Sequence, residues 1–182
     1  MMRKILRMVI GSVLAVGIIM VIGVAALAWP LTYSRWTGGG SFFTGEGMRV
    51  THGFELYSSA SGGNPGPPVA EPNNLEVNWE GNRFHLTSLD VVSTYYDSAL
   101  DGPKPPKSSI DNVIIGEGTG RYNGVDGATI SFTFTDQGEP GTKDSVCMTI
   151  WDADGNEVLF VEFSTLMFGN HQSHLLTGGK IP

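Results

Sequence analysis

The sequence has almost no cysteine and none of the short motifs by which common enzymes are recognised. Cys147 is the one cysteine among 182 residues, which excludes an internal disulfide. Its position between alternating apolar residues predicts a buried, unreactive thiol. The chain contains no N-x-[ST] sequon, no G-x-S-x-G elbow and no H-E-x-x-H motif. We therefore expect a protein that is not an enzyme and has no catalytic residue.

Positive charge is also scarce, and it is unevenly placed. The chain has 11 Lys and Arg against 18 Asp and Glu, for a net charge of −7. Arg3, Lys4 and Arg7 stand near the N-terminus, whereas every acidic residue follows Trp29. A surface this acidic repels phosphate backbones, so nucleic acid is not an expected partner.

One long apolar run is present, from Met8 to Trp29, without a single charged residue. A helix of this length reaches about 33 Å, enough for a hydrocarbon core of about 30 Å. Because the cations precede it, the positive-inside rule places the N-terminus in the cytoplasm. We expect residues 1–36 to be a signal anchor or a signal peptide, with residues 8–29 in the membrane and the rest outside the cytoplasm.

Cleavage is the alternative to a permanent anchor. Ala26-Leu27-Ala28 fits the small-x-small pattern of a signal-peptide cleavage site. The protein would be secreted if it were cut after Ala28. The apolar run exceeds the usual core of a signal peptide, which favours the anchor.

The remaining chain lacks long runs of Ala, Leu, Glu and Lys and is rich in Gly, Pro, Ser, Thr and Asn. Residues 37–47 are interpreted as a linker with a first short strand, and Thr37–Ser41 as a flexible joint. Residues 48–176 are expected to form one β-domain, and residues 177–182 a C-terminal tail. Two segments rich in Pro, Gly and Ser, 58–74 and 97–111, are expected to be loops.

Alternating apolar and polar residues predict the strands of this domain. In the clearest one, Ala128, Ile130, Phe132 and Phe134 share one face. Other strands are expected at 48–56, 75–79, 83–86, 89–96, 113–115, 146–150 and 158–163, with a last one after Gly169. No amphipathic helix separates them, which indicates an all-β antiparallel sandwich or barrel; we expect a β-sandwich of eight to ten short strands.

Two stretches carry a resemblance to a known family. They are GGGSFFTGEGMRVTHGFEL with NNLEVNWEGNRFHL, and GTGRYNGVDGATISFTFTDQGEPGTKD with GNHQSH. They resemble the small post-COAP β-sandwich modules of bacterial secreted and cell-surface proteins, over about Gly38 to His174. The resemblance implies a fold and a surface location but no activity. Cysteines that relatives carry are absent here, with Tyr57 standing near the first of their positions.

Clustered carboxylates suggest two candidate calcium sites. Asp136, Glu139 and Asp144 lie within one loop, and hard cations such as Ca²⁺ need several oxygen ligands from a loop that folds back. The alternative is a polar turn whose carboxylates cap backbone N–H groups. Asp152 and Asp154 belong to a D-x-D-G-N segment, where a hairpin turn is favoured over calcium.

Histidine and tryptophan offer weaker candidates. His171 and His174 are three residues apart and therefore on opposite faces of a strand, which argues against a shared zinc ion. Trp151 falls on the face opposite Val146, Met148 and Ile150, so it is the candidate for stacking on a sugar ring. Trp79 shares a face with Leu75 and Val77 and is expected in the core.

The sequence thus predicts a non-enzymatic exported or membrane-anchored bacterial envelope protein, whose β-sandwich serves contact or structural organisation. The alternative is a calcium- or glycan-binding module on the cell surface. No cofactor other than possible Ca²⁺ is expected, and the sequence does not distinguish a protein from a glycan partner.

Overall fold

The computed structural model describes residues 33–59, 66, 72–101 and 111–176. The apolar helix predicted over residues 8–29, the tail at 177–182 and most of both predicted loops lie outside these ranges. Within them, no helix is long and apolar enough to cross a bilayer.

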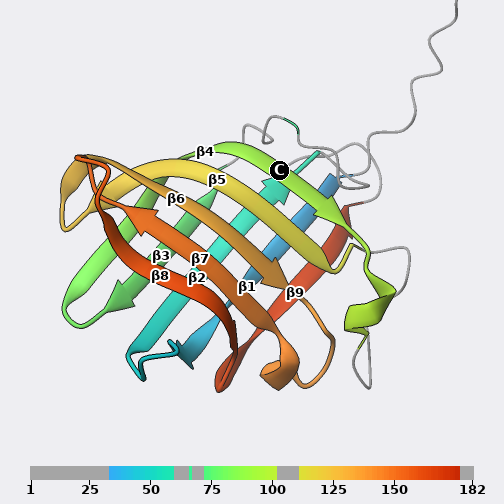
Figure 1. The fold of residues 1–182 in the computed structure, drawn as a ribbon. Coiled ribbons are helices and arrows are strands. Elements are labelled where there is room, and N and C mark those ends of the chain that lie inside the picture. The colour runs from blue at the N-terminus through green and yellow to red at the C-terminus, as the bar shows by residue number, and fades with distance from the viewer. Residues whose placement is uncertain (1–32, 60–65, 67–71, 102–110, 177–182) are drawn as a thin grey trace, which may run out of the picture.

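Nine antiparallel strands form one sheet (Figure 1). In the sheet they follow the order β8-β7-β6-β5-β4-β3-β2-β1-β9, so neighbours in sequence are neighbours in space until the last strand returns to pair with the first. Their bounds are β1 Tyr33–Phe43, β2 Arg49–Ser58, β3 Asn74–Trp79, β4 Asn82–Tyr95, β5 Val113–Tyr122, β6 Val125–Thr135, β7 Ser145–Trp151, β8 Glu157–Thr165 and β9 Phe168–Leu176. Short 3₁₀ turns at Ser98–Leu100 and Gly141–Lys143 are the only helical segments in the described ranges.

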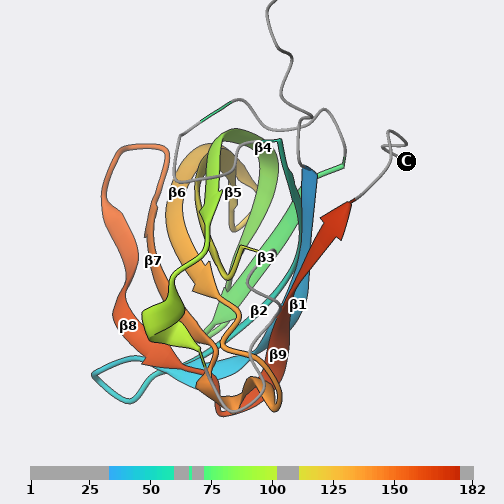
Figure 2. The ribbon, with the colours of Figure 1, turned by 90° about the vertical axis from the view of Figure 1, so that its right-hand side faces the viewer.

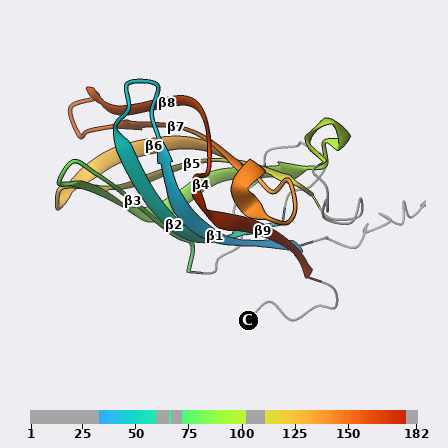
Figure 3. The same cartoon turned by 90° about the horizontal axis from the view of Figure 1, so that it is seen from below.

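The sheet curls so that its two halves face each other (Figures 2 and 3). Strands β6 to β8 lie on one side of the interior and β1 to β3 on the other. Near the C-terminal end of β8 the halves touch: Ser164 Oγ donates to the Phe43 carbonyl at 2.7 Å, and the Met167 N–H to the Ser41 carbonyl at 2.9 Å. The prediction of an all-β antiparallel domain is confirmed, and the strands form one continuous sheet.

Alternation of apolar and polar residues explains which face is buried. On β6, Ala128, Ile130, Phe132 and Phe134 point into the interior as predicted, while Ser131 and Thr133 are less buried. Trp79 is also in the core, stacked on Tyr122 with ring centroids 5.8 Å apart. Each buried Phe or Leu side chain stabilises the fold by about 1.5–3 kcal/mol.

Strand β1 corrects one prediction. The flexible joint expected at Thr37–Ser41 is wrong, because these residues pair with β2 on one side and β9 on the other. The glycines there permit close strand packing: a Cβ on Gly38 would lie 2.6 Å from the Asn170 carbonyl oxygen, and one on Gly40 would overlap the Phe168 carbonyl. In this chain the glycine run is the centre of a strand rather than a linker.

Two other strands are longer than predicted. The segments expected at 83–86 and 89–96 merge into β4, with irregular register opposite β5 between Leu86 and Ser88 and between Leu89 and Val91. The short strand expected at 113–115 continues through the glycine-rich segment to Tyr122. A Cβ on Gly116 would overlap the Phe132 ring, so glycine lets this strand lie against large aromatic side chains.

Candidate functional site

The β6–β7 loop, residues 136–144, binds β9 through its carboxylates. Asp144 Oδ2 accepts the His171 N–H at 2.6 Å, and Asp136 Oδ2 accepts the Ser173 N–H at 2.9 Å. The other oxygen of each carboxylate accepts an N–H of the loop, from Gln137 at 2.8 Å and Gly138 at 3.0 Å. Since β9 pairs with β1 on its opposite side, these two carboxylates take the place of a neighbouring strand.

Glu139, the third predicted calcium ligand, also contacts β9. Its Oε1 accepts the side-chain amides of Asn170 at 3.1 Å and Gln172 at 3.2 Å. The loop therefore brings Asp136, Glu139 and Asp144 to one strand, as hydrogen-bond acceptors. In the described ranges no group of three or more His, Cys, Asp and Glu side chains is arranged to hold a metal ion. Calcium binding at this loop stays a prediction.

Burial shifts the acidity of both carboxyl groups. Desolvation raises the pKa of Asp144 to about 7, against the opposing effect of its two backbone N–H donors. Desolvation likewise raises the pKa of Asp136. A carboxylate that has lost its water must be held by protein donors, and the N–H groups of β9 and the loop fill this role.

A buried histidine pair lies beside the loop. The Nε2 atoms of His52 on β2 and His171 on β9 lie 2.8 Å apart, at hydrogen-bond distance. His171 Nδ1 lies 3.0 Å from the Thr135 carbonyl oxygen. The rings of Phe54 and Phe134 pack against both histidines. Because His52 and His171 are distant in sequence, no spacing pattern predicts this contact.

The surroundings keep both imidazoles uncharged. Burial lowers the pKa of His52 to about 4 and the pKa of His171 to about 3, the neighbouring His52 lowering the latter further. His174 lies on the opposite face of β9, where its Nε2 is 3.2 Å from Thr37 Oγ1. The prediction that the two histidines of the H-x-x-H pair diverge is confirmed.

The second carboxylate segment forms a hairpin turn between β7 and β8. Asp152 Oδ1 accepts the N–H groups of Asp154 and Asn156 at 3.0 and 2.9 Å, and Gly155 adopts a positive φ of 82°. The favoured interpretation of this segment as a turn is confirmed. Hydrogen bonding with Asn156 lowers the pKa of Asp152.

Trp151 and Cys147 both lie on β7. Trp151 is half-buried, opposite Thr129 on one side and Glu157 on the other, and stacking on a sugar stays a prediction. The sequence predicted a buried Cys147, but its side chain is only half-buried. Together with Phe160 and Glu162 it borders a shallow outer hollow of about 180 Å³. Burial, with Glu162 nearby, raises the pKa of its thiol, which keeps the thiol protonated and unreactive.

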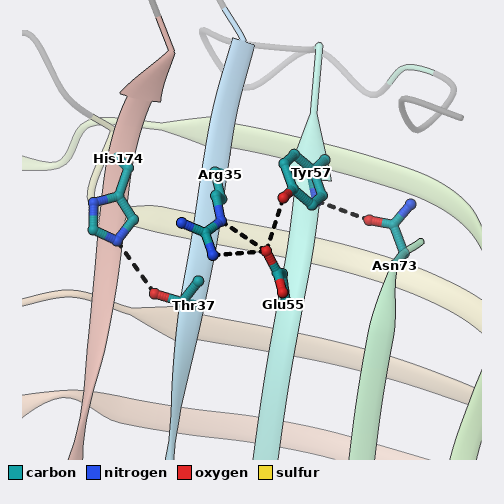
Figure 4. A network of polar contacts seen from close by, with 6 residues as sticks. All are labelled: Arg35, Thr37, Glu55, Tyr57, Asn73 and His174. Atoms are coloured by element: carbon teal, nitrogen blue, oxygen red, sulfur yellow. Dashed lines mark hydrogen bonds and ion pairs between the residues drawn. The ribbon is translucent and has the colours of Figure 1, made fainter. Parts of the chain in front are cut away.

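A polar network crosses the outer face of β9, β1 and β2 (Figure 4). Glu55 Oε1 binds Arg35 Nη2 at 2.7 Å and accepts the Tyr57 hydroxyl at 2.8 Å, while Asn73 Oδ1 accepts the Tyr57 N–H at 2.7 Å. These bonds lower the pKa of Glu55. The Arg35 and Glu55 side chains are 39% and 42% exposed, and such cross-strand pairs support a solvated sheet face without forming a site.

Exposed apolar side chains are concentrated where the end of β8 meets β1 and β9. The described residues include eight exposed large apolar side chains, and five of these lie at the end of β1, on β8, in the β8–β9 turn and at the start of β9. They are Phe43, Phe160, Phe163, Met167 and Phe168, of which Phe168 is 69% exposed. We call these five residues the apolar edge.

The sequence contained part of this signal. The segment VLFVEFSTLMF has apolar residues too closely spaced for a strand with one solvated face, which leaves some of them outside the core. Which of them are exposed depends on the irregular β7–β8 register and on β8 lying last in the sheet, and local sequence specifies neither.

Comparison with protein-family models, with curated proteins and with solved structures gives no match for this chain.

Proposed function

We propose that this chain is a non-enzymatic bacterial envelope protein whose β-domain binds another macromolecule through the apolar edge. The observation that carries the proposal is the concentration of exposed aromatic side chains beside a terminal strand of the sheet. Exposed apolar patches rimmed by polar residues mark interaction surfaces on soluble domains. The buried polar residues support a structural role for the interior, because Asp136, Asp144 and His171 are hydrogen-bonded to backbone groups.

The proposal includes a cellular location. Residues 8–29 enter the membrane with the N-terminus in the cytoplasm and the β-domain outside, or the chain is secreted after cleavage at Ala28. The charge asymmetry of the sequence supports this orientation. Intact mass and fractionation of the native protein separate the two forms: the anchored form keeps its full mass in the membrane fraction.

A finer description of the fold belongs with this proposal. The facing halves of the curled sheet serve as the two layers of a β-sandwich, and we propose that the domain is of the post-COAP kind. The all-β antiparallel architecture and the sequence segments quoted above support both statements. A family of surface modules without a known activity agrees with a contact function.

Site-specific photo-crosslinking in the native envelope tests the contact function. The photoreactive p-benzoylphenylalanine replaces Phe163, or Val125 as an equally exposed control outside the apolar edge. We expect a discrete crosslinked product from position 163 and none from position 125. Equal products from both positions, or none from position 163, would contradict the proposal.

Calcium or glycan binding is the alternative function. It rests on Asp136, Glu139, Asp144, Asp152 and Asp154 for calcium and on Trp151 for a sugar. A glycan array probed with the full chain and with Trp151→Ala tests the sugar. Binding that Trp151→Ala removes would favour this alternative over protein contact.

A further inference from the structure

A groove runs between β8 and the turn that joins β1 to β2. It has a volume of about 400 Å³. One side is lined by residues 44–46 and Met48, and the other by residues 157–160 and Glu162. Figure 3 shows the turn and β8 at the same end of the molecule. The groove lies next to the apolar edge, with Phe160 belonging to both.

One side of the groove is an open strand edge. Strand β8 is the last in the sheet order, and its partner β7 occupies only one side. In the described ranges, the hydrogen bonds from β8 and the following turn to β1 begin at Ser164 and end at Met167. From Glu157 to Glu162, β8 therefore faces the groove with backbone groups that a further strand can pair with.

The lining of the groove defines the chemistry of its occupant. Met48, Val158 and Phe160 supply apolar surface, while Glu46, Glu157 and Glu162 supply three carboxylates. The described lining residues include no Lys, Arg or His. An extended peptide that carries an apolar residue and a Lys or Arg two positions apart, and therefore on one face, matches this surface in shape, backbone hydrogen bonding and charge.

A second copy of the chain matches it poorly. A two-fold antiparallel pairing of β8 with itself brings Glu157 and Glu162 of both copies to one short shared edge. Four carboxylates gathered along one edge repel one another. The net charge of −7 per chain adds to this repulsion.

Edge carboxylates also serve in many proteins to prevent aggregation of open strands. An edge that is only protected in this way gains nothing from exposed aromatic side chains, which increase its tendency to aggregate. Here Phe160 and Phe163, 55% and 62% exposed, lie on the same strand as Glu157 and Glu162. The combination suits selective binding of a cationic partner.

We propose that this groove accepts an extended basic segment of a partner protein, which adds to the sheet as a strand beside β8. The inference rests on the proposed contact function and specifies its partner. Apolar side chains of the segment pack on Met48, Val158 and Phe160, and its cations lie near Glu46, Glu157 and Glu162.

Selection from a displayed library of random nine-residue peptides tests the proposal, with the full-length chain in detergent as the target. We expect enrichment of peptides in which Lys or Arg stands two positions from an apolar residue. Affinity of the enriched peptide should fall about tenfold for Glu157→Gln/Glu162→Gln and remain unchanged for Glu117→Gln, an exposed carboxylate on β5. Enrichment of acidic or uncharged peptides, or equal effects of both variants, would overturn it.

Backbone methylation separates strand addition from simple charge attraction. Two versions of the enriched peptide carry N-methyl groups on alternate residues, one version in each phase. We expect one phase to abolish binding and the other to retain most of it, because a strand added at an edge pairs along one side only. Equal binding of both would overturn strand addition.

The two proposals fail in different ways. A crosslink at position 163 in the native envelope together with failure of the peptide tests leaves the contact function standing and rejects the strand-addition inference. Loss of that crosslink removes the contact function itself.

Discussion

Two buried carboxylates are the most informative individual residues of this fold. Asp136 and Asp144 accept the outward N–H groups of β9, which would otherwise be buried without partners. The sequence offered calcium binding or capping of backbone N–H groups for these residues, and the structure gives them the second role. Local spacing leaves this choice open because the N–H groups that they cap belong to a strand some thirty residues later.

Replacing Asp144 with Asn tests this role. Asparagine keeps one acceptor oxygen, but its NH₂ group replaces the other and cannot accept a hydrogen bond. The backbone N–H of either His171 or Gln137 would therefore be buried without an acceptor. We expect a loss of about 1–3 kcal/mol in the free energy of unfolding, measured by urea denaturation. Asp154→Asn in the exposed β7–β8 turn is the control and should change stability by less than about 0.5 kcal/mol. Equal effects of the two variants would contradict the role of Asp144.

The buried histidines predict a dependence of stability on pH. Both have pKa values lower in the folded chain than the ordinary value of 6.5, so the unfolded chain binds more protons below that pH. Their contribution to stability is therefore complete above pH 6.5 and decreases as the pH falls. Asp144, whose pKa is raised from 3.8 to about 7, contributes with the opposite sign between those values.

His52→Phe measures the histidine contribution. The ring is surrounded by Phe42, Phe54, Phe134 and His171, so phenylalanine fills the space but removes the hydrogen bond to His171 at both pH values. When the pH falls from 7 to 5, protonation linked to His52 should lower the unfolding free energy of the wild type by about 2 kcal/mol. The variant should not show this part of the decrease. Urea titrations at the two pH values give the difference. A decrease of equal size in both proteins would rule out His52 as its source.

At the scale of elements, strand β1 shows how composition misleads. Gly38, Gly39 and Gly40 have the composition of a flexible linker, yet they lie in the middle of a strand paired on both sides. The clear alternation of β6 was predictable because its pattern alone identifies the buried face. A glycine run carries no such pattern, and only the neighbouring strands reveal why side chains are excluded there.

Gly40→Ala tests this close packing. A Cβ at this position would overlap the Phe168 carbonyl oxygen, so β9 or β1 must shift. We expect a loss of about 2–3 kcal/mol in unfolding free energy. Gly45→Ala, a few residues away in the β1–β2 turn, has nothing within 4 Å of the added Cβ and should be nearly neutral. Similar stability of both variants would contradict the packing argument.

At the scale of the whole molecule, the fold class follows from sequence but the arrangement of the site does not. Antiparallel pairing and most strand positions follow from alternation and turn residues, whereas β1 and the continuous β4 do not. The closeness of His52 to His171 and the exposure of the apolar edge depend on which strands end the sheet. Those features come from the return of β9 to β1, which leaves β8 with one paired neighbour among the described strands.

Thermal melting with calcium tests the alternative function on the intact chain. A site with Kd near 10 µM would add about 2.7 kcal/mol at a hundredfold higher calcium concentration. We expect no change in Tm at about 1 mM calcium, because all four oxygens of Asp136 and Asp144 already accept N–H groups. A rise in Tm that Asp136→Asn abolishes would establish a calcium site in the β6–β7 loop.

The pairing of β1 with β9 also governs when the domain can fold. Strand β1 emerges first among the nine during synthesis, but one of its two neighbours is the last to emerge. Contacts between such distant parts of a chain form slowly, because a long loop must close first. Until β9 arrives, β1 has an open edge and the carboxylates of the β6–β7 loop have no strand to hold. Synthesis of the chain through β9 therefore precedes completion of the sheet, and a chain stopped before Phe168 would expose both open elements.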